Sequence, residues 1–294
     1  MYTYYNFEVR LPNANLILPI VDLSNPLSQI IGNPNLEPSK THNLYLNFNN
    51  YDYGTKSGYY MYGGINFIES EVVASRFFDP TDLISRTTYQ NIDDMMNSYA
   101  GINWNKSIKR EEHTFRLSLG LSGNFNISKG ITNNAEYRSE AFSFEPNASV
   151  GWDYGELLTI EPSYSYNWNL SNFSNYTIDK TSYFTHNFKI QTTSRWPKHV
   201  VFGNDFGYTY NSNISDGFKK DFFLLNTSLG YNFMADKMLF KVKVYDLLNQ
   251  NQSAVRTITP TAIQDIENTV LKRYVMFSLT YQIEKFGGKK KQEF

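Results

Sequence analysis

The chain has 294 residues, enough for one large domain or two ordinary ones, and its formal net charge is -1. This near-neutral balance argues against a nucleic-acid-binding protein, and the lack of cysteine excludes disulfides and thiolate metal sites. No run of about 18 apolar residues occurs, so no transmembrane helix is expected. Aromatic residues make up 17%, with 23 Tyr and 22 Phe. This composition fits strands with aromatic girdles at two membrane interfaces, and equally a tyrosine-rich soluble β-protein.

Apolar and polar residues alternate along most of the chain, and a period of two residues predicts extended strands. About twelve strands are expected, near residues 2–9, 44–52, 59–67, 88–105, 115–127, 142–152, 158–168, 184–191, 200–210, 222–233, 238–244 and 275–283. Several reach the about 9–11 residues that a tilted strand needs to cross a bilayer. Pro146 and Pro162 fall inside strands, where a ladder donor is lost, and predict a bulge or a kink there.

Each of the regular strands has one apolar and one polar face. Leu119 and Leu229 lie near the middle of their apolar faces, with Ser118 and Ser228 beside them on the polar faces. The polar faces carry the charges that fall within the strands, among them Arg116, Glu145, Glu161, Asp205, Lys241 and Lys243. In a membrane barrel the apolar faces meet lipid and the polar faces line the lumen, so we expect a wet, charge-balanced interior.

The connections between the expected strands alternate in length. Short ones are residues 153–155, 195–198 and 234–237, and long ones are 10–39, 72–86, 128–138, 171–181 and 250–272. Outer-membrane barrels have tight turns on the periplasmic side and long loops outside, whereas a soluble sandwich has no reason to segregate loop lengths. The pattern therefore predicts an all-β, antiparallel transmembrane β-barrel of about twelve strands, located in the outer membrane.

Four segments resemble, in order, motifs of the TonB-dependent outer-membrane receptors, most of all the Bacteroidetes-type outer membrane protein beta-barrel family. Residues 32–38 (GNPNLEP) resemble the signature before a strand, and residues 89–92 with a later glycine resemble the "YxN…G" strand. Residues 244–251 and 273–281 resemble the segment before the last strand and that strand itself. The matching motif positions are Asn33, Pro34, Leu36, Pro38, Asn91, Gly101, Asp246, Leu248, Asn249 and Tyr281.

The chain departs from the family pattern in three ways. Ser39 follows the motif where the family has a glutamate, and residues 287–294 add a basic tail after the expected last strand. No plug domain, TonB-box or signal peptide is recognisable in residues 1–294. The family's barrel has about 22 strands, so twelve correspond to roughly its C-terminal half. We therefore expect one domain that forms a partial barrel, with unpaired edges near Tyr2–Val9 and Tyr274–Ile283.

The resemblance implies a receptor that imports a nutrient, such as a ferric chelate, cobalamin or an oligosaccharide, on energy passed through TonB. Its partners would be outer-membrane lipid, the barrel-assembly machinery, the nutrient and, through a plug, the TonB system. One alternative is a self-contained twelve-stranded outer-membrane pore. Another is a soluble carbohydrate-binding β-protein.

No catalytic, cofactor or metal site is expected, and the protein is not expected to be an enzyme. His42, His113, His186 and His199 fall on different strands without zinc-ligand spacing, and no G-x-S-x-G motif occurs. The long loops contain aromatic residues that could stack on a ligand or pack within the loops, including Phe77, Phe78, Phe173 and Tyr176.

Overall fold

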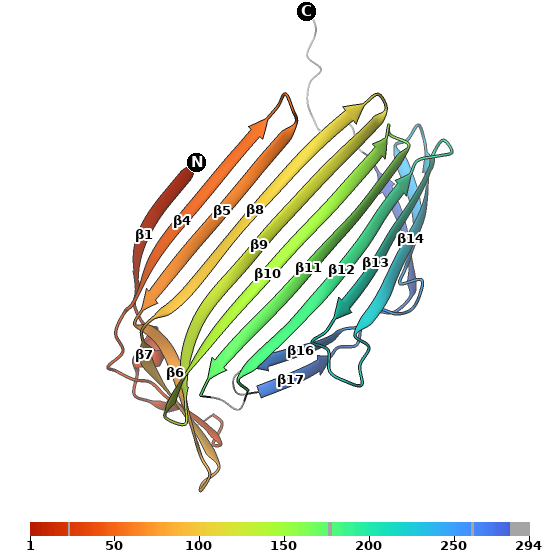
Figure 1. Cartoon of the computed structure of the whole chain (residues 1–294). Coiled ribbons are helices and arrows are strands. Elements are labelled where there is room, and N and C mark those ends of the chain that lie inside the picture. Colours follow the sequence, from red (N-terminus) through yellow and green to blue (C-terminus); the bar gives the residue numbers. More distant parts are fainter. Residues whose placement is uncertain (23, 176–177, 260–261, 283–294) are drawn as a thin grey trace, which may run out of the picture.

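The computed structural model describes residues 1–22, 24–175, 178–259 and 262–282, and most of them belong to one curved, mainly antiparallel sheet (Figure 1). Its main path joins twelve strands in the order of the chain. They are β1 (Tyr2–Arg10), β4 (Ser39–Asp52), β5 (Ser57–Glu69), β8 (Met95–Arg110), β9 (His113–Thr132), β10 (Ala135–Tyr154), β11 (Leu158–Ser174), β12 (Lys180–Ser194), β13 (Val200–Asn211), β14 (Asp221–Phe233), β15 (Met238–Tyr245) and β18 (Tyr274–Tyr281). The predicted all-β class and the antiparallel arrangement are confirmed.

One edge of the sheet carries only tight turns, and the long connections all lie at the other edge, as the sequence predicted. In Figure 1 the tight turns lie at the top, between β4 and β5, β8 and β9, β10 and β11, β12 and β13, and β14 and β15. The bottom edge carries folded connections (Figure 1). These contain α1 (Ala14–Ile17), β2 (Val21–Asp22), β3 (Ser28–Ile31), β6 (Glu71–Asp79), β7 (Ile84–Ile92), β16 (Ala254–Thr259) and β17 (Ala262–Glu267). Among the described residues no helix is long and apolar enough to span a membrane.

Three of the predicted long loops consist largely of strand. Residues 171–181 belong mostly to β11, which continues to Ser174, and to β12, which begins at Lys180. Residues 72–86 form most of the β6–β7 hairpin. Residues 128–138 continue β9 and β10 to a two-residue turn at Asn133 and Asn134, whose φ angles of 50° and 63° fit the mirror-image turns that hairpins favour. In residues 128–138 the alternation fails because polar residues fall on both faces of the two strands. A connection that the sequence analysis left out, residues 212–220, also lies at this edge.

The predicted strand at residues 88–105 is two strands that meet at a sharp corner. β7 ends at Ile92 and β8 begins at Met95, with Asp94 at φ 62° between them. Asp93 holds the corner, because its carboxylate accepts a 2.8 Å hydrogen bond from the backbone N–H of Ser70. A hydrogen bond of this kind, from a backbone N–H to a side chain, replaces the strand-to-strand hydrogen bond that the N–H would otherwise make.

Neither proline produces the bulge that the sequence suggested. β10 and β11 keep one register throughout, because Phe144 lies opposite Trp168 and Asn147 lies opposite Ser165. The ladder between these strands is simply interrupted at Pro146 and Pro162, each of which is paired on its other side. Each proline therefore removes a hydrogen bond between the two strands but inserts no extra residue, so no bulge forms.

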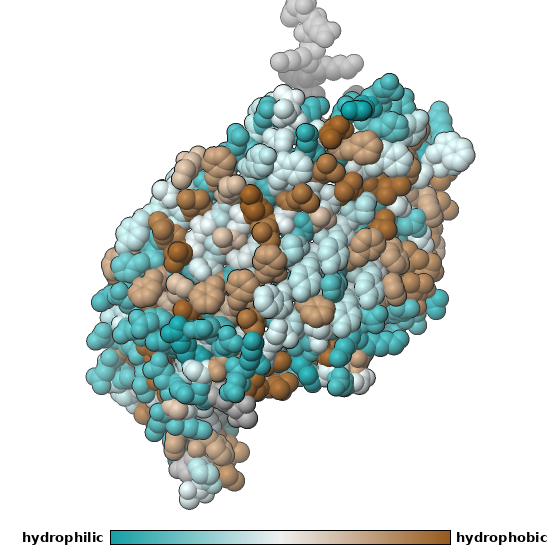
Figure 2. Space-filling model, in the orientation of Figure 1, coloured by the Kyte–Doolittle hydropathy of each residue, from teal (hydrophilic) through white to brown (hydrophobic). Residues whose placement is uncertain are grey.

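The two faces of the sheet differ in polarity. The convex face, seen in Figure 2, is rich in apolar and aromatic side chains across its middle and hydrophilic toward both ends. Leu119 and Leu229 stand on it with 53% and 56% of their surface exposed. The apolar run from Phe142 to Trp152 on β10 has about the length, 9–11 residues, that crosses a bilayer. The molecule thus turns its oily residues outward.

The sheet is not closed, and this confirms the expectation of an open structure. Within the described residues, β1 pairs with β4 alone and β18 pairs with β15 alone. Every residue of β1 is exposed. The expected last strand reached Ile283, which lies outside the described residues.

Candidate functional site

The concave face of the sheet forms a polar wall whose half next to the tight turns is charged. Arg116 of β9 contacts Asp153 of β10 and, at 3.2 Å, Glu161 of β11. Lys243 of β15 lies 3.1 Å from Asp205 of β13. The opposite charges that the sequence placed on one face thus meet across strands.

The two other charged residues predicted for this wall stand apart. The register puts Glu145 opposite Ser122 and Lys241 opposite Ser278, so both are on the concave face. Neither has an ion pair within the described ranges. Four of the six predicted charges therefore neutralise one another in pairs, which agrees with the expected charge-balanced interior.

The half of the wall next to the long connections is neutral. A cross-strand row runs over β8 to β12 through Tyr99, Asn124, Ser143, Asn169 and Tyr183, each opposite the next. The next row toward the loops is made of Asn97, Asn126, Ala141, Ser171 and Thr181. Amides, hydroxyls and tyrosines can exchange hydrogen bonds with a ligand without requiring it to carry charge.

Two of the sequence motifs meet in space at the loop edge. Asn91, at the end of β7, accepts a 2.9 Å hydrogen bond from the backbone N–H of Glu37 and donates to the Glu37 carbonyl at 2.9 Å. The same amide donates to the Ser70 carbonyl at 2.7 Å. Asn33 donates to the carbonyl of Tyr89 at 2.8 Å. The motif before β4 is therefore fastened to the strand that precedes the β7–β8 corner.

The other residues of the motif at residues 32–38 form a local turn or lie beside it. Asn33 accepts a 3.0 Å hydrogen bond from the N–H of Asn35, which closes a local turn. Pro34 is exposed, while Leu36 and Pro38 are half-buried. Ser39, where the related proteins have a glutamate, is 7% exposed and donates a 2.7 Å hydrogen bond to Glu71. The carboxylate near this position thus comes from β6.

The third motif folds around a buried carboxylate. Asp246 is only 2% exposed, and its two oxygens accept hydrogen bonds from the backbone N–H groups of Gln250 (2.9 Å) and Asn251 (3.1 Å). Its own N–H donates to Asn226 of β14 at 2.9 Å. Asn249 has φ 57° and accepts from the N–H of Arg273 at 3.4 Å. Leu248 remains 42% exposed. These residues shape the connection after β15.

Gly101 and Tyr281 lie away from both motif clusters. A Cβ on Gly101 would come within 2.4 Å of the Tyr62 ring, so the glycine lets this ring lie flat on the concave wall. Tyr281 ends β18 at the tight-turn edge, opposite Met238, and is 58% exposed. The structure thus brings most of the predicted motif residues into two anchors at the loop edge and leaves these two elsewhere.

The loop aromatics differ in their availability to a ligand. Phe77 and Phe78, on β6 of the projecting hairpin, are 39% and 49% exposed. Phe173 is only 8% exposed, so the hypothesis that it stacks on a ligand is wrong. Tyr176 lies outside the described residues.

All four histidines lie among aromatic rings, which the sequence analysis missed. His113 stacks on Trp152 with an interplanar angle of 12°, and His199 lies 6.1 Å from the Tyr231 ring, both near the tight turns. His42 lies beside Phe7, and His186 contacts Tyr164 through a 2.6 Å hydrogen bond, both toward the loop edge. The described residues contain no group of three His, Cys, Asp or Glu able to hold a metal.

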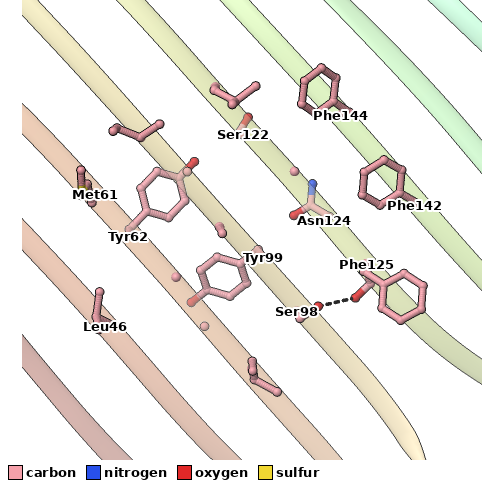
Figure 3. Close-up of a pocket in the computed structure, with 18 of the residues that line it drawn as sticks. Leu46, Met61, Tyr62, Ser98, Tyr99, Ser122, Asn124, Phe125, Phe142 and Phe144 are labelled. Carbon is pink, nitrogen blue, oxygen red and sulfur yellow. Dashed lines mark hydrogen bonds between the residues drawn. The ribbon is translucent and has the colours of Figure 1, made fainter.

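The convex face is hollowed where small residues share one cross-strand row. Gly63 lies opposite Ala100, and Ala100 opposite Gly123. Larger apolar side chains surround this hollow of about 780 Å³ (Figure 3), among them Leu46, Met61, Phe125, Phe142 and Phe144. Ser98 donates its hydroxyl to a backbone carbonyl at 3.0 Å. The lining is suited to apolar chains and not to a water-soluble ligand.

Comparison with known proteins agrees with this architecture. No curated protein matches the chain by sequence. The sequence model of one family, described as the outer membrane protein beta-barrel family, matches residues 1–281. A barrel in the outer membrane needs strands long enough to cross the bilayer, an apolar face toward lipid and a polar face toward the lumen, and this sheet has all three. The chain belongs to the outer membrane protein beta-barrel family and is an outer-membrane barrel protein.

Proposed function

We propose that the chain forms part of the wall of a receptor that imports a nutrient across the outer membrane in a TonB-dependent manner. The open sheet is the observation that carries this proposal. An unpaired strand edge in lipid leaves backbone groups without partners, at several kcal/mol each, so β1 and β18 need further strands. Barrels of about 22 strands, wide enough to hold a plug, are those of outer-membrane transporters.

The arrangement of the wall supports the same proposal. In outer-membrane barrels the long loops face outward, which puts the neutral half of the concave face on the outer side and the ion-paired half toward the periplasm. A ligand arriving from outside would first meet amides, hydroxyls and tyrosines. The ion-paired half would contact a plug, through which the TonB system acts. Binding and passage, with no chemical conversion, is the activity we infer.

The partners follow from this role. Outer-membrane lipid covers the convex face, and the barrel-assembly machinery inserts the strands. The nutrient is a ferric chelate, cobalamin or an oligosaccharide. A soluble carbohydrate-binding protein does not agree with membership in an outer-membrane family. The self-contained pore would need a ladder between β1 and β18, and their described residues have none.

Uptake measurements test the proposal. Cells that lack the gene, cells that lack TonB and cells that lack both are compared for growth on limiting ferric chelates, cobalamin or oligosaccharides. We expect all three strains to share one nutrient defect, which the intact gene repairs only when TonB is present. Uptake that persists without TonB and rises linearly with nutrient concentration would instead identify a passive pore.

A further inference from the structure

The concave wall is hollowed on its outer half, over the centre of the neutral rows. Asn124, Asn126, Ser143, Asn169, Ser171 and Tyr183 line this hollow, together with the small residue Ala141 and its neighbour Phe142. Its volume is about 270 Å³, near the lower end of the about 300–1,000 Å³ of small-molecule pockets. Such a space suits one ring of a larger ligand.

Several polar groups in the hollow are available to a ligand. Asn124 donates to the Ser143 hydroxyl at 3.0 Å, so its own carbonyl oxygen is still open. Asn126, Ser171 and Tyr183 make no side-chain hydrogen bond to any other described residue. The free groups therefore include a carboxamide, an aliphatic hydroxyl and a phenol, which donate as well as accept.

The hollow is also free of charge. Glu145 is the nearest charged residue on β10 within the concave face, in the next row after Ser143 toward the tight turns. The cations of the concave face lie farther toward the tight turns: Lys189 of β12 is opposite Ser163, three rows from Tyr183, and Arg116 is one row beyond it, paired with Asp153 and Glu161. The residues that line the hollow include no cation, so a strongly anionic ligand would exchange water there for uncharged partners, which is unfavourable.

We propose that this hollow binds one ring of a neutral oligosaccharide. Sugar hydroxyls match the mixed donors and acceptors of Asn126 and Ser171, and the Tyr183 ring offers an apolar face with a polar tip. The inference rests on the proposed uptake function for its orientation, and it selects the oligosaccharide from the three nutrient classes.

A binding panel on outer-membrane fractions from cells that express the full chain tests the proposal. The probes are labelled hexameric oligosaccharides of glucose, xylose, mannose and N-acetylglucosamine, with ferric citrate, a ferric catecholate and cobalamin as competitors of other classes. Membranes without the protein give the background. We expect a neutral oligosaccharide to bind above that background and the two iron chelates and cobalamin not to.

Three variants locate the site. Asn126→Ala and Tyr183→Phe each remove a group in the hollow and should weaken oligosaccharide binding about tenfold, the equivalent of one good hydrogen bond. Asn105→Ala is the matched control, because this asparagine faces the same wall, opposite Ser118, in its charged half. It should leave binding unchanged.

The possible results separate the inference from the proposed function. Binding of only a chelate or cobalamin, or of no probe, would overturn the proposal that the ligand is a neutral oligosaccharide. Oligosaccharide binding that all three variants leave intact would overturn the site. Site-specific oligosaccharide binding combined with uptake that does not need TonB would uphold the inference and reject the proposed function.

Discussion

Asn91 and Glu37, 54 positions apart in the sequence, exchange hydrogen bonds of 2.9 Å in both directions between the Asn91 carboxamide and the Glu37 backbone. This is the geometry of a β-ladder made with a side chain. It fixes the irregular segment before β4 to the end of β7 at the loop edge.

Replacing Asn91 should therefore loosen this edge. Asn91→Ala leaves the N–H of Glu37 and the carbonyls of Glu37 and Ser70 without this partner, at about 1–3 kcal/mol for each buried group and less where water enters. We expect a lower urea midpoint for the protein in lipid vesicles. Asn35→Ala, an exposed neighbour in the same turn, is the control, and an equal effect of both substitutions would contradict the anchoring role.

The sequence predicted the membrane-crossing part of the fold and little of its outer rim. In the apolar middle of the convex face, the alternation of apolar and polar residues, as from Phe115 to Ile127, is enough to identify a strand. Beyond this middle, polar residues fall on both faces in residues 128–138, so the sequence there shows no period of two although β9 and β10 continue to the turn at Asn133 and Asn134. Asp94, with its positive φ, gave no signal that β7 and β8 are separate.

The motif residues were identified by resemblance, but their contacts could not be predicted. Asn33 reaches Tyr89, and Ser39 reaches Glu71, across 56 and 32 positions. No local pattern links such residues, since the pairing depends on where the sheet places the strand ends. The neutral hollow was missed for the same reason: its asparagines, serines and tyrosine come from four strands, β9 to β12.

The lipid-facing register gives a second prediction. Leu119→Arg or Leu229→Arg puts a charge near the middle of the oily convex face and should cost about 2–4 kcal/mol of folding free energy in a bilayer. Ser118→Arg and Ser228→Arg point to the wet concave face and should cost less. Urea titrations in vesicles measure the difference, and equal costs within each pair would reject the assigned faces.

A third prediction concerns the packing of Tyr62 on Gly101. Gly101→Ala puts a methyl group where the Tyr62 ring lies, 2.4 Å from its nearest atom, and overpacking of this kind costs about 1–3 kcal/mol. Tyr62→Ala removes the ring. The double variant should therefore be more stable than the sum of the two single effects predicts. Strictly additive losses of stability would show that the ring moves aside at no cost.

The fourth prediction follows from the β16–β17 hairpin at the loop edge, outside the membrane-spanning strands. Arg256 donates two hydrogen bonds to Asp265, of 2.7 and 2.8 Å. These bonds hold the pKa of the Asp265 carboxyl below its ordinary value of 3.8. They also raise the pKa of Arg256, which stays protonated at every working pH.

Because the pKa of Asp265 is lower in the folded than in the unfolded hairpin, the pair stabilises the hairpin above the unfolded pKa, and this contribution is lost as the pH falls through the lowered folded pKa. Hydrogen exchange measured from pH 7 down to about pH 2, corrected for intrinsic rates, should show steady protection of the β16–β17 amides near neutrality and a loss only in strong acid. Asp265→Asn should be less protected at neutral pH and lack the acid step, while the amides of β10 serve as an internal control. An acid step that survives in Asp265→Asn would assign it to another carboxyl group.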